Sequence, residues 1–589
     1  AMASMVDALV HRGPDERGEA ALPGCAMGHA RLRILDLSTG QQPMADVAHR
    51  YWIVFNGEIY NFRELRDELE RKGRAFRTSS DTEVVINAYD EWGRGCLDRF
   101  RGMFAFALWD TQSKTLFAAR DLFGEKPLYY AAGRGGAFLV ASELRALLAA
   151  RLTDRTLDLQ SVDAYLALGY VPPERTIWEG VGTLPPAHAL TWRDGRVDVA
   201  PYWQPSFGRR SITLPEAAEE LRAATARAVK RQMIADVPVG AFLSGGLDSS
   251  TVVALMQQQS VHPVKTFSVG FGTMINELPY ARAVARRYGT EHHEIDLGEI
   301  DAPAMARRVA EVYDEPFADT SSIPTFLVAQ YARRYVTVVL SGDGGDEMFG
   351  GYSRYVALQR SQAIRMATPQ WLLLRAGSRL LRDRWGRLAE RSQIAGIAAR
   401  ANDLWERNLM MHTVIAAPER RRLRGAANGY DAGAYEPSAD VSGLDRAFDF
   451  DVRVYLAGDI LTKVDRAAMA NSLETRAPFL DRDVAELALS LPATLKVSDG
   501  ERKRVMRAAF EELWPEEIRD RPKHGFGSPV AQWLRGPAMR ALVDDAAAPS
   551  SRLRRLLPGL SAADLQRGNY ASWTLLMLGL WLDAHEVTV

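Results

Sequence analysis

Short apolar runs alternate with helical stretches in the middle of this sequence, and small or acidic residues directly follow two of the runs. VPVGAFL precedes SGGLDSS at residues 244–250, and YVTVVL precedes SGDGGDE at residues 341–347. Buried strands that alternate with helices favour a parallel, doubly wound sheet. Ligands of such sheets bind outside the carboxyl ends of the strands, so the two loops are predicted to face each other across one binding site.

The first of these loops has the composition of a phosphate-binding loop. Gly245 and Gly246 let the backbone approach a ligand, and the N–H groups at the start of the following helix can donate to an anion. A carboxylate in a phosphate-binding loop, here that of Asp248, is explained if Mg²⁺ bridges it to the phosphates. Asp346 of the second loop can complete that metal site. No GxxxxGK(S/T) motif occurs, which excludes a Walker-type loop. A helix-capping turn and an exposed acidic turn are the structural alternatives for the two loops.

Residues 1–205 are predicted to form a separate α+β domain. Runs such as YWIVFNGEIYNF, GMFAFALWD, TLFAARD and AFLVASE are typical of strands in packed sheets, and ELRDELERKG and EVVINAYDEWG are typical of helices between them. QPSFGRRSITLP at residues 204–215 is typical of a linker. Residues 206–589 then form the second domain, and its sequence beyond about residue 360 is expected to be mostly helical, with solvated arginine-rich faces.

Charge and cysteine content exclude several classes of function. The formal net charge of −1 gives no global field for nucleic acid or an anionic membrane surface. The two cysteines, Cys25 and Cys96, exclude a disulfide scaffold and fit a reducing cytosol. Even the apolar run TLLMLGLWL is far shorter than the ~20 residues of a membrane span. We therefore expect a cytoplasmic protein without a nucleic-acid or membrane partner.

Several long motifs make the sequence resemble a known enzyme family. SGGLDSS, SGDGGDEMFGGY, ILTKVDRAAMANSLETRAPFLD and RPKHGFGSP, in this order, resemble the synthetase domain of glutamine-hydrolysing asparagine synthetases. HRGPDERG, HARLRILDLSTGQQP, FNGEIYNF, SSDTE, FRGMFAFALWD and RDLFGEKPLYY resemble the glutaminase domain of that family. The resemblance covers nearly the whole chain, and YVPPERTIWEGVGTLPPAH and EPFADTSSIPT bring it closest to bacterial amidotransferases of exopolysaccharide and exosortase gene clusters.

This resemblance implies a fold for each domain. The N-terminal domain is expected to be an α+β glutaminase sandwich of the Ntn type that lacks its first strand. The second domain is expected to be an α/β synthetase domain of the adenine-nucleotide α-hydrolase-like, PP-loop type with added helices. Relatives are often homodimers, so a homodimer is one arrangement open to this chain.

The resemblance also implies a two-step ligase reaction that uses ATP and Mg²⁺. ATP activates a carboxylate, by default that of aspartate or a related acid, as an acyl-adenylate, and pyrophosphate is released. Ammonia derived from glutamine then attacks the acyl carbon, and AMP leaves. A magnesium ion held by Asp248 and Asp346 would stabilise the developing charge on pyrophosphate. The positions implied for ATP and pyrophosphate are Leu243, Ser244, Gly245, Gly246, Asp248, Ser249, Ser250, Val269, Ser341, Gly342 and Lys463.

Three residues are implied as catalytic. Lys523, in RPKHGF, is expected to reach the phosphates and to stabilise the second transition state. Asp343 stands where asparagine synthetases have an acid and β-lactam synthetases a tyrosine, and Glu474 stands at the position of that tyrosine's glutamate partner. An acid here can take a proton from the attacking amine. For Glu474 a buried structural pair with Arg476 is an equal alternative.

The family's glutamine pocket has counterparts in the first domain. Arg31 matches the arginine that pairs with the substrate carboxylate, for which a planar guanidinium is well suited. Asn56 and Gly57 match the oxyanion-hole positions. Glu58 and Asp81 match the residues that hold the amino end of glutamine.

The family's nucleophile has no counterpart in this sequence. Glutaminases of the family carry Cys as the first residue, and its free α-amino group acts as the base. This sequence begins at Ala1, and neither Cys25 nor Cys96 has a free α-amine. AMASMVDALV has helical spacing without a preceding cap, which is typical of a helix whose beginning is missing. We therefore expect an N-terminally incomplete sequence rather than a natural loss, and a 589-residue chain that uses ammonia.

Two other functions stay open at this stage. A β-lactam-synthetase-like cyclase would close a ring on an internal amine and ignore ammonia, and the acid at Asp343 in place of tyrosine disfavours it. A non-catalytic scaffold derived from the enzyme would have lost Mg-ATP binding, and the intact SGGLDSS and SGDGGDE loops disfavour that. The acceptor carboxylate itself is not determined by these motifs.

Overall fold

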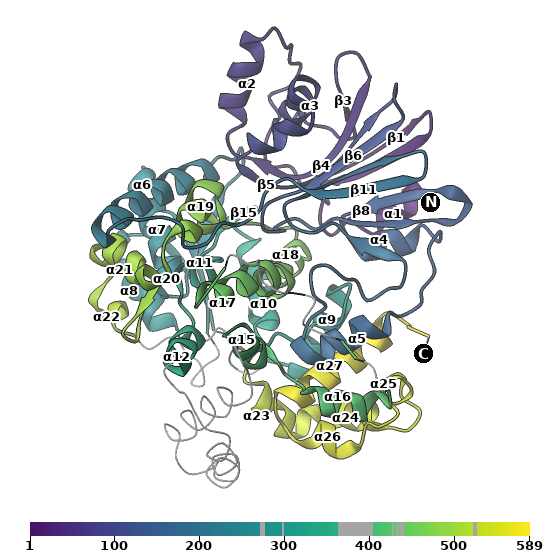
Figure 1. Cartoon of the computed structure of the whole chain (residues 1–589), viewed down its shortest axis with the longest axis vertical. Helices are drawn as coiled ribbons and strands as arrows, with labels where there is room; N and C mark the ends of the chain where they lie inside the picture. Colours follow the sequence, from purple (N-terminus) through teal and green to yellow (C-terminus); the bar gives the residue numbers. More distant parts are fainter. Residues whose placement is uncertain are drawn as a thin grey trace.

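The computed structural model describes residues 1–270, 277–296, 298, 300–362, 404–426, 429–430, 435, 441–521 and 527–588. Figure 1 shows antiparallel sheets in the N-terminal part of the chain, at the upper right, and many helices in the remainder. Within the described ranges, no helix is long and apolar enough to cross a membrane. The TLLMLGLWL run lies in α27 (Tyr570–Ala584), where most of its side chains are buried in the protein core.

A six-stranded antiparallel sheet is the centre of the N-terminal part. Its strand β5 (Gly102–Asp110) is buried on both faces, and its alternate residues belong to two different cores because successive side chains of a strand point to opposite faces. Phe106 packs in the core that contains α2 (Phe62–Arg71) and α3 (Asp81–Trp92), and Ala107 packs in the opposite core. The strand order is β11 (Arg196–Pro201), β10 (His188–Arg193), β6 (Thr115–Arg120), β5, β4 (Tyr51–Ile59) and β3 (Met44–Ala45).

A hairpin and a small sheet contribute to the opposite core. The predicted helix at the start of the sequence is confirmed as α1 (Met2–Asp7), which packs against the hairpin. The result is the layered α+β arrangement predicted for this part of the chain. The hairpin strands are β1 (Glu16–Leu22) and β2 (Cys25–Arg31), and the small sheet has the order β8 (Phe138–Ala141), β7 (Tyr129–Ala132) and β9 (Val181–Thr183).

A five-stranded parallel sheet is the centre of the second part, as the alternating apolar runs predict. Its order is β14 (Glu291–Asp296), β13 (Lys265–Gly270), β12 (Val239–Phe242), β15 (Val338–Leu340) and β16 (Glu474–Arg476). β12 and β15 are neighbours, so the loops that follow them leave the same edge of the sheet side by side. One core contains α6 (Leu214–Gln232), α7 (Leu247–Gln259) and α8 (Leu278–Tyr288), and another contains α10 (Ser322–Ala332) and α18 (Thr462–Met469).

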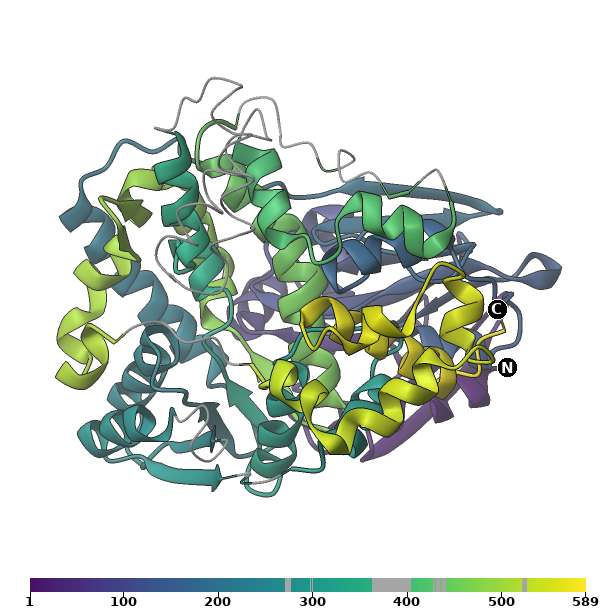
Figure 2. The ribbon, with the colours of Figure 1, turned by 90° about the horizontal axis from the view of Figure 1, so that it is seen from below.

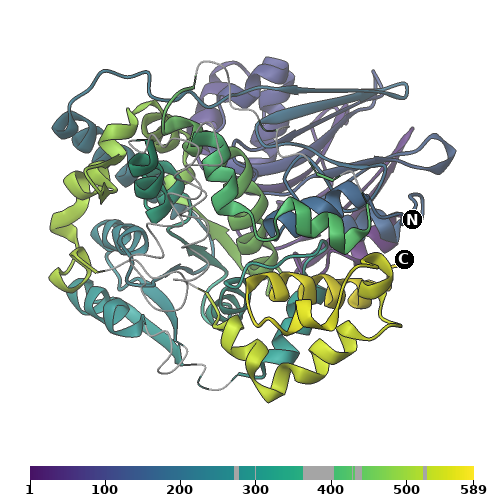
Figure 3. The same cartoon turned by 60° about the horizontal axis from the view of Figure 1, so that its bottom comes forward.

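A third core joins the two parts of the chain. It contains α4 (Leu144–Ala149) and α5 (Leu159–Leu168) together with α9 (Ala302–Val312), α24 (Pro537–Ala547) and α27. Figures 2 and 3 show the C-terminal helices, in yellow, beside the N-terminal part. The sequence patterns did not predict α4 and α5. α5 is largely buried on all sides and therefore lacks the one-sided apolar period of a surface helix.

Residues 204–213 of the predicted linker contain no helix or strand, and its last two residues are the first residues of α6. β11 ends at Pro201, and α6 begins at Leu214 after a capping box formed by Thr213 and Glu216. Beyond residue 360 the described residues are mostly helical, as predicted, and residues 363–403 lie outside them. The remaining elements are η1 (Gly93–Asp98), η2 (Arg134–Gly136), α11 (Gly345–Phe349), α12 (Ser353–Gln362), α15 (Leu404–His412), α16 (Ala417–Arg424), α17 (Asp445–Phe450), η4 (Asp451–Leu461), η5 (Pro478–Leu480), α19 (Arg482–Ser490), α20 (Ala493–Lys496), β17 (Val497–Ser498), β18 (Glu501–Arg502), α21 (Arg504–Phe510), η6 (Glu511–Leu513), α22 (Glu516–Arg519), α23 (Val530–Arg535), α25 (Arg552–Leu556) and α26 (Ala562–Gln566).

Candidate functional site

A cavity of about 510 Å³ lies at the carboxyl ends of the parallel strands. Both glycine-rich loops line it, together with residues of α18 and of the segment just before α21. We call it the synthetase cavity. Ser250 does not line it, because this residue lies inside α7 and is 1% exposed. The expected residues that do line it are Leu243, Ser244, Gly245, Gly246, Asp248, Ser249, Val269, Ser341, Gly342, Asp343, Asp346 and Lys463.

Glycines of the second loop allow it to approach the first loop closely. A Cβ at Gly342 would lie 2.8 Å from the backbone nitrogen of Ser249, and a Cβ at Gly345 would lie 2.6 Å from Cγ of Asp248. Real Cβ atoms do not approach other heavy atoms this closely, so either side chain would push the loops apart. The two loops predicted to face each other are therefore in contact.

Lys503 connects the two expected metal ligands. Its Nζ lies 2.5 Å from both carboxylate oxygens of Asp248 and 2.6 Å from Oδ1 of Asp346. A Cβ on Gly351 would lie 2.3 Å from Cε of Lys503, so this packing also depends on a glycine. The sequence did not single out Lys503, since a lysine within an ERKR run has the appearance of an exposed charge.

A second lysine of the synthetase cavity also has an acidic partner. Nζ of Lys463 lies 2.9 Å from Oδ2 of Asp319, another cavity residue that the sequence did not single out. Asp319 in turn accepts hydrogen bonds from the backbone N–H and the hydroxyl of Ser321. Burial disfavours the charge of Lys463, but Asp319 and Asp459 outweigh it and raise the pKa of Lys463 above its usual value. Lys463 is therefore a charged ammonium group inside the cavity.

Asp343 has the surroundings of a carboxylate that can accept a proton. It lines the synthetase cavity, and burial raises its pKa above the usual value for aspartate. The hydroxyl of Ser341 donates to its Oδ2 at 2.7 Å. A raised pKa makes a carboxylate a stronger base, which suits proton transfer from an amine.

Lys523 falls in residues 522–526, which lie outside the described residues. Its neighbour in the sequence, Arg521, lines the synthetase cavity and donates to the carbonyl of Gly245 at 3.3 Å. Arg521 also pairs with Glu277. The chain therefore reaches the cavity immediately before the segment that contains Lys523.

A second cavity, of about 240 Å³, lies in the N-terminal part, and we call it the amidotransferase cavity. Its walls come from β2, β4 and the start of α3, with Met469 and Glu474 contributed by the second part of the chain. All five residues expected to bind glutamine line it, namely Arg31, Asn56, Gly57, Glu58 and Asp81.

The polar groups of this cavity are positioned by local hydrogen bonds. Arg31 donates to Glu16 at 3.1 Å and to the carbonyl of Asp36 at 2.6 Å, which holds its guanidinium in the wall. Gly57 has a φ of +140°, and a Cβ there would lie 2.0 Å from the carbonyl oxygen of Met103. Nδ2 of Asn56 is buried and has no hydrogen-bond acceptor among the described residues. A buried donor without an acceptor is what an oxyanion site requires.

Three carboxylates, Glu58, Asp81 and Glu474, line the amidotransferase cavity, and one arginine contacts two of them. Burial raises the pKa of Asp81 to about 6, and burial together with the charge of Asp81 raises the pKa of Glu58 well above its usual value. Arg476, which is fully buried, lies 3.5 Å from Glu58 and donates from Nε to Glu474 at 2.8 Å. These three neighbouring carboxylates make this part of the wall suited to the ammonium group of an amino acid.

The expected catalytic position of Glu474 needs a correction. Glu474 does not line the synthetase cavity that contains Asp343, and the structure does not bring the two carboxylates together. In the parallel register Glu474 lies beside Val338, whereas Asp343 follows the end of β15. The arginine pair, the alternative that the sequence left open, is the arrangement found.

The two cysteines have the properties of unreactive thiols. Cys25 lines the amidotransferase cavity, but burial raises its pKa to about 11. Cys96 is fully buried, and burial raises its pKa to about 12. The thiolate is the reactive form, so neither side chain has the properties of a nucleophile.

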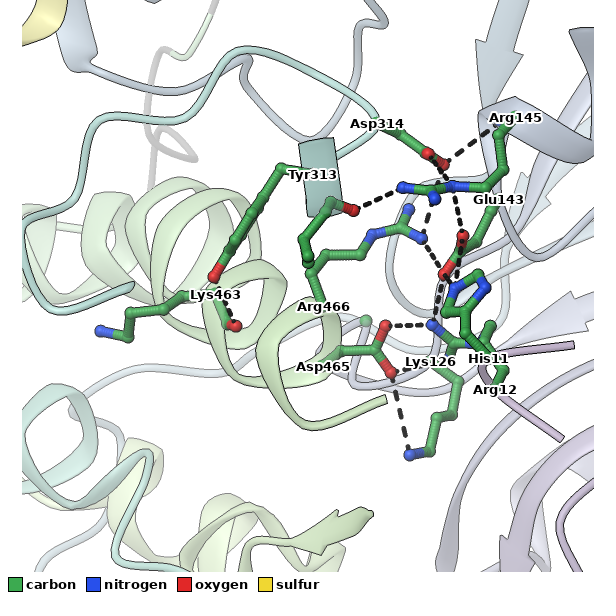
Figure 4. A network of polar contacts seen from close by, with 12 residues as sticks. His11, Arg12, Lys126, Glu143, Arg145, Tyr313, Asp314, Lys463, Asp465 and Arg466 are labelled. Atoms are coloured by element: carbon green, nitrogen blue, oxygen red, sulfur yellow. Dashed lines mark hydrogen bonds and ion pairs between the residues drawn. The ribbon is translucent and has the colours of Figure 1, made fainter. Parts of the chain in front are cut away.

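A buried network of charges joins the two parts of the chain (Figure 4). Arg12, from the loop after α1, contacts both Asp465 of α18 and Glu143 just before α4. Arg466, the next residue of α18, also pairs with Glu143, at 2.7 Å. Burial opposes ionisation of Asp465, but Arg12 holds its pKa below the usual value. The network therefore fixes α18 against the N-terminal part.

α18 extends from one cavity to the other. Lys463 and Val464 at its first turn line the synthetase cavity, and Met469 at its last turn lines the amidotransferase cavity. The stretch between Lys463 and Met469 covers about 9 Å at the rise of an α-helix. The two cavities are thus neighbours on opposite ends of one helix.

Two family profiles agree with this two-part architecture. The glutamine amidotransferase domain profile matches residues 1–203, and the asparagine synthase profile matches residues 220–583. A glutamine-hydrolysing asparagine synthetase of Bacillus subtilis is 34% identical over 99% of this chain and 92% of its own length. A protein named putative asparagine synthetase of Mycobacterium bovis is 36% identical over 89% of this chain and 83% of its own length. A solved glutamine phosphoribosylpyrophosphate amidotransferase of B. subtilis covers 58% of this chain and 78% of its own, at 16% identity with a TM-score of 0.26.

Proposed function

The chain belongs to the asparagine synthase family of ATP-dependent amidotransferases, and from this premise we propose that it joins ammonia to a carboxylate through an acyl-adenylate. Aspartate is the default acceptor. ATP is attacked at its α-phosphorus by the acceptor carboxylate, with release of pyrophosphate. Ammonia then attacks the acyl carbon, and AMP leaves with the electron pair of the broken bond.

The observation that carries this proposal is the placement of the two cavities on one helix. A glutamine-binding cavity and a nucleotide-binding cavity at the two ends of α18 fit a reaction in which ammonia made at one site is used at the other. Met469 and Val464 supply apolar surface at the two ends of α18. An apolar path would suit ammonia, because neutral NH₃ remains unprotonated where water is excluded.

The two glycine-rich loops are proposed to bind the triphosphate. The N–H groups at the start of α7, with Ser244 and Ser249, can donate to phosphate oxygens. Lys463 carries a positive charge in the same cavity and can leave Asp319 for the α-phosphate. This assignment also places Leu243 and Val269 beside the nucleotide, through backbone and apolar contacts. We include the PP-loop type of synthetase domain in the proposal.

Asp248 and Asp346 fit a magnesium site. Their carboxylates already share a cation, the Lys503 ammonium, so the arrangement of donors accepts positive charge. Hard oxygen ligands are what Mg²⁺ prefers. When bound, Mg²⁺ would neutralise charge that develops on pyrophosphate. Among the described residues, no group of three or more metal-ligating side chains is present, so further ligands would come from phosphate and water.

Asp343 is proposed as the base of the second step. Its raised pKa and its position in the synthetase cavity suit removal of a proton from the attacking amine. Ser341 holds the carboxylate in place by donating to Oδ2. An acid at this position, in place of tyrosine, supports an external amine over ring closure. We also retain Lys523 as the cation expected to stabilise this transition state.

Glutamine is proposed to bind in the amidotransferase cavity. Arg31 can pair with its carboxylate, and Glu58 with Asp81 can hold its ammonium group. Asn56 and Gly57 can donate to the oxyanion. Two free cysteines, Cys25 and Cys96, support a reducing compartment such as the cytoplasm as the place of this reaction.

The test is a paired assay on the 589-residue chain. Ammonia, Mg-ATP and aspartate should give equal amounts of pyrophosphate, AMP and amide, with the amide identified by mass. Glutamate release from glutamine is measured in parallel and reports on the amidotransferase cavity separately. A product that has lost water without gaining nitrogen would point to the cyclase instead. Failure to bind Mg-ATP would favour a non-catalytic scaffold.

A further inference from the structure

One lysine lies between the two carboxylates proposed as metal ligands. Nζ of Lys503 is 2.5 Å from Oδ1 and Oδ2 of Asp248 and 2.6 Å from Oδ1 of Asp346. Asp248 lies in the first turn of α7, Asp346 lies in α11, and Lys503 immediately precedes α21. Three segments that are distant in the sequence thus meet at one ammonium group.

The backbone around this contact is adapted to it. A Cβ on Gly351 would lie 1.7 Å from Oδ1 of Asp346 and 2.3 Å from Cε of Lys503, so only glycine permits the approach. Lys503 itself has a φ of +56°, which costs a residue with a side chain roughly 1 kcal/mol or more. Lys503 is 6% exposed and lines the synthetase cavity beside Arg502 and Arg507. The ammonium therefore lies at the edge of a cavity to which two neighbouring arginines also contribute.

Charge explains why a cation is needed here before any ligand binds. Two carboxylates held this close repel each other strongly at reduced dielectric, and a shared ammonium removes that repulsion. Mg²⁺ binds oxygen at about 2.0–2.1 Å. An ammonium at 2.5 Å from the same oxygens occupies the space where the metal would bind. The lysine and a metal ion therefore cannot use these carboxylate faces at the same time.

We propose that Lys503 is the resident cation of this site. It holds Asp248 and Asp346 together in the metal-free protein, is displaced when the metal binds, and then donates to the pyrophosphate group of the nucleotide. Lysine carries its charge on a flexible four-carbon stem, so the ammonium can move while the backbone stays in place. The identity of the anion rests on the proposed function, whereas the ion pair and its displacement by metal do not.

The first test measures binding of Mn²⁺ alone, by electron paramagnetic resonance and without nucleotide. Lys503→Met removes the ammonium and keeps most of the stem. We expect the variant to bind Mn²⁺ at least about tenfold more tightly, because no resident cation has to be displaced. Arg504→Met is the matched control, since Arg504 is the next residue and pairs with the exposed Glu501. The control should bind Mn²⁺ as the wild type does.

The second test measures thermal unfolding in EDTA. Lys503→Met should unfold roughly 5 °C below the wild type, because Asp248 and Asp346 lose their counter-charge. Added Mn²⁺ should remove this difference in unfolding temperature, because the metal supplies the missing counter-charge. If Lys503→Met does not fold without metal, the double variant with Asp346→Asn removes the repulsion and should fold. A double variant that stays unfolded would overturn the counter-charge role.

The third test measures inorganic pyrophosphate binding at saturating Mn²⁺. Lys503→Met should bind pyrophosphate about tenfold more weakly than the wild type, because one charge-assisted hydrogen bond is lost. Mn²⁺ binding that is unchanged or weaker in Lys503→Met would overturn the displacement. If the Mn²⁺ results hold but the wild type releases no pyrophosphate from ATP and an acceptor, the lysine role stands and the proposed function fails.

Discussion

Arg12 and Asp465 form a bidentate ion pair across the junction between the two parts of the chain, and both nitrogen–oxygen distances are 2.8 Å (Figure 4). Arg12 is 5% exposed and Asp465 is 5% exposed. Asp465 lies two residues beyond Lys463, which lines the synthetase cavity. The loop after α1 therefore supports the helix that carries a proposed nucleotide ligand.

We predict that Arg12→Met destabilises the protein by about 3–5 kcal/mol, because it leaves Asp465 buried without its strongest partner. Chemical denaturation measures the loss. Arg17→Met is the matched control, since the Arg17–Asp7 pair is more than half exposed at both side chains and should contribute at most about 1 kcal/mol. Equal losses in the two variants would contradict the role assigned to the buried pair.

We predict that glutamine binds more tightly as the pH rises from 5 to 7. Burial raises the pKa of Asp81 to about 6, and the ammonium group of glutamine requires the ionised carboxylate. Calorimetric titration with glutamine measures the affinity. Asp81→Asn should flatten the profile in part, because the pKa of Glu58 is raised as well and continues to titrate.

The same carboxyl predicts a pH dependence of stability. At pH 5 the folded protein keeps a proton on Asp81 that the unfolded chain, with a pKa near its usual 3.8, has released. The contribution of Asp81 to the free energy of unfolding therefore falls as the pH rises from about 4 to 6 and is constant above that. Denaturation of wild type and Asp81→Asn across this range measures it. A contribution that increases with pH would contradict the buried, protonated state.

We predict that Asp343→Asn separates the two steps of the reaction. An amide cannot take the proton of the attacking amine, so amide formation should fall by about 10²-fold or more. A first turnover of pyrophosphate should persist, because adenylation does not need this base. Rapid-quench measurement of pyrophosphate and amide compares the steps. Asp346→Asn is the control in which both products should be lost together.

We predict that Glu474→Gln reduces stability more than turnover. The structure pairs Glu474 with the fully buried Arg476, so the variant should lose about 3 kcal/mol while ammonia-dependent turnover changes only a few-fold. Denaturation and steady-state kinetics on the same preparation compare the two effects. A loss of turnover like that of Asp343→Asn, at unchanged stability, would instead support a catalytic role for Glu474.

We predict that Gly342→Ala weakens Mg-ATP binding about tenfold, because the added methyl group separates the two loops. Equilibrium binding of a fluorescent ATP analogue measures the affinity. Gly95→Ala is the matched control, since a Cβ there meets nothing within 4 Å. The control should leave both affinity and stability unchanged.

The strands and helices that carry the candidate sites could be predicted because each has a local signal. VPVGAFL and YVTVVL are apolar enough to form β12 and β15, and the glycines that follow them permit the close contact of the two loops. The helix α5 was not predicted, because its burial on nearly all sides removes the one-sided apolar periodicity of a surface helix. The side chain of Lys523 lies outside the described residues, so its expected role stays a prediction.

The sequence by itself determined the parallel sheet and the two facing loops, because these depend on residue type over short stretches. Only the tertiary structure decided which charges meet. Lys503 contacts Asp248 across 255 positions, and Arg12 contacts Asp465 across 453. Such pairs depend on how separate elements pack, and no local pattern specifies the partner of a buried charge. Burial makes each pair important for stability, because a charge without its partner is costly where water is excluded.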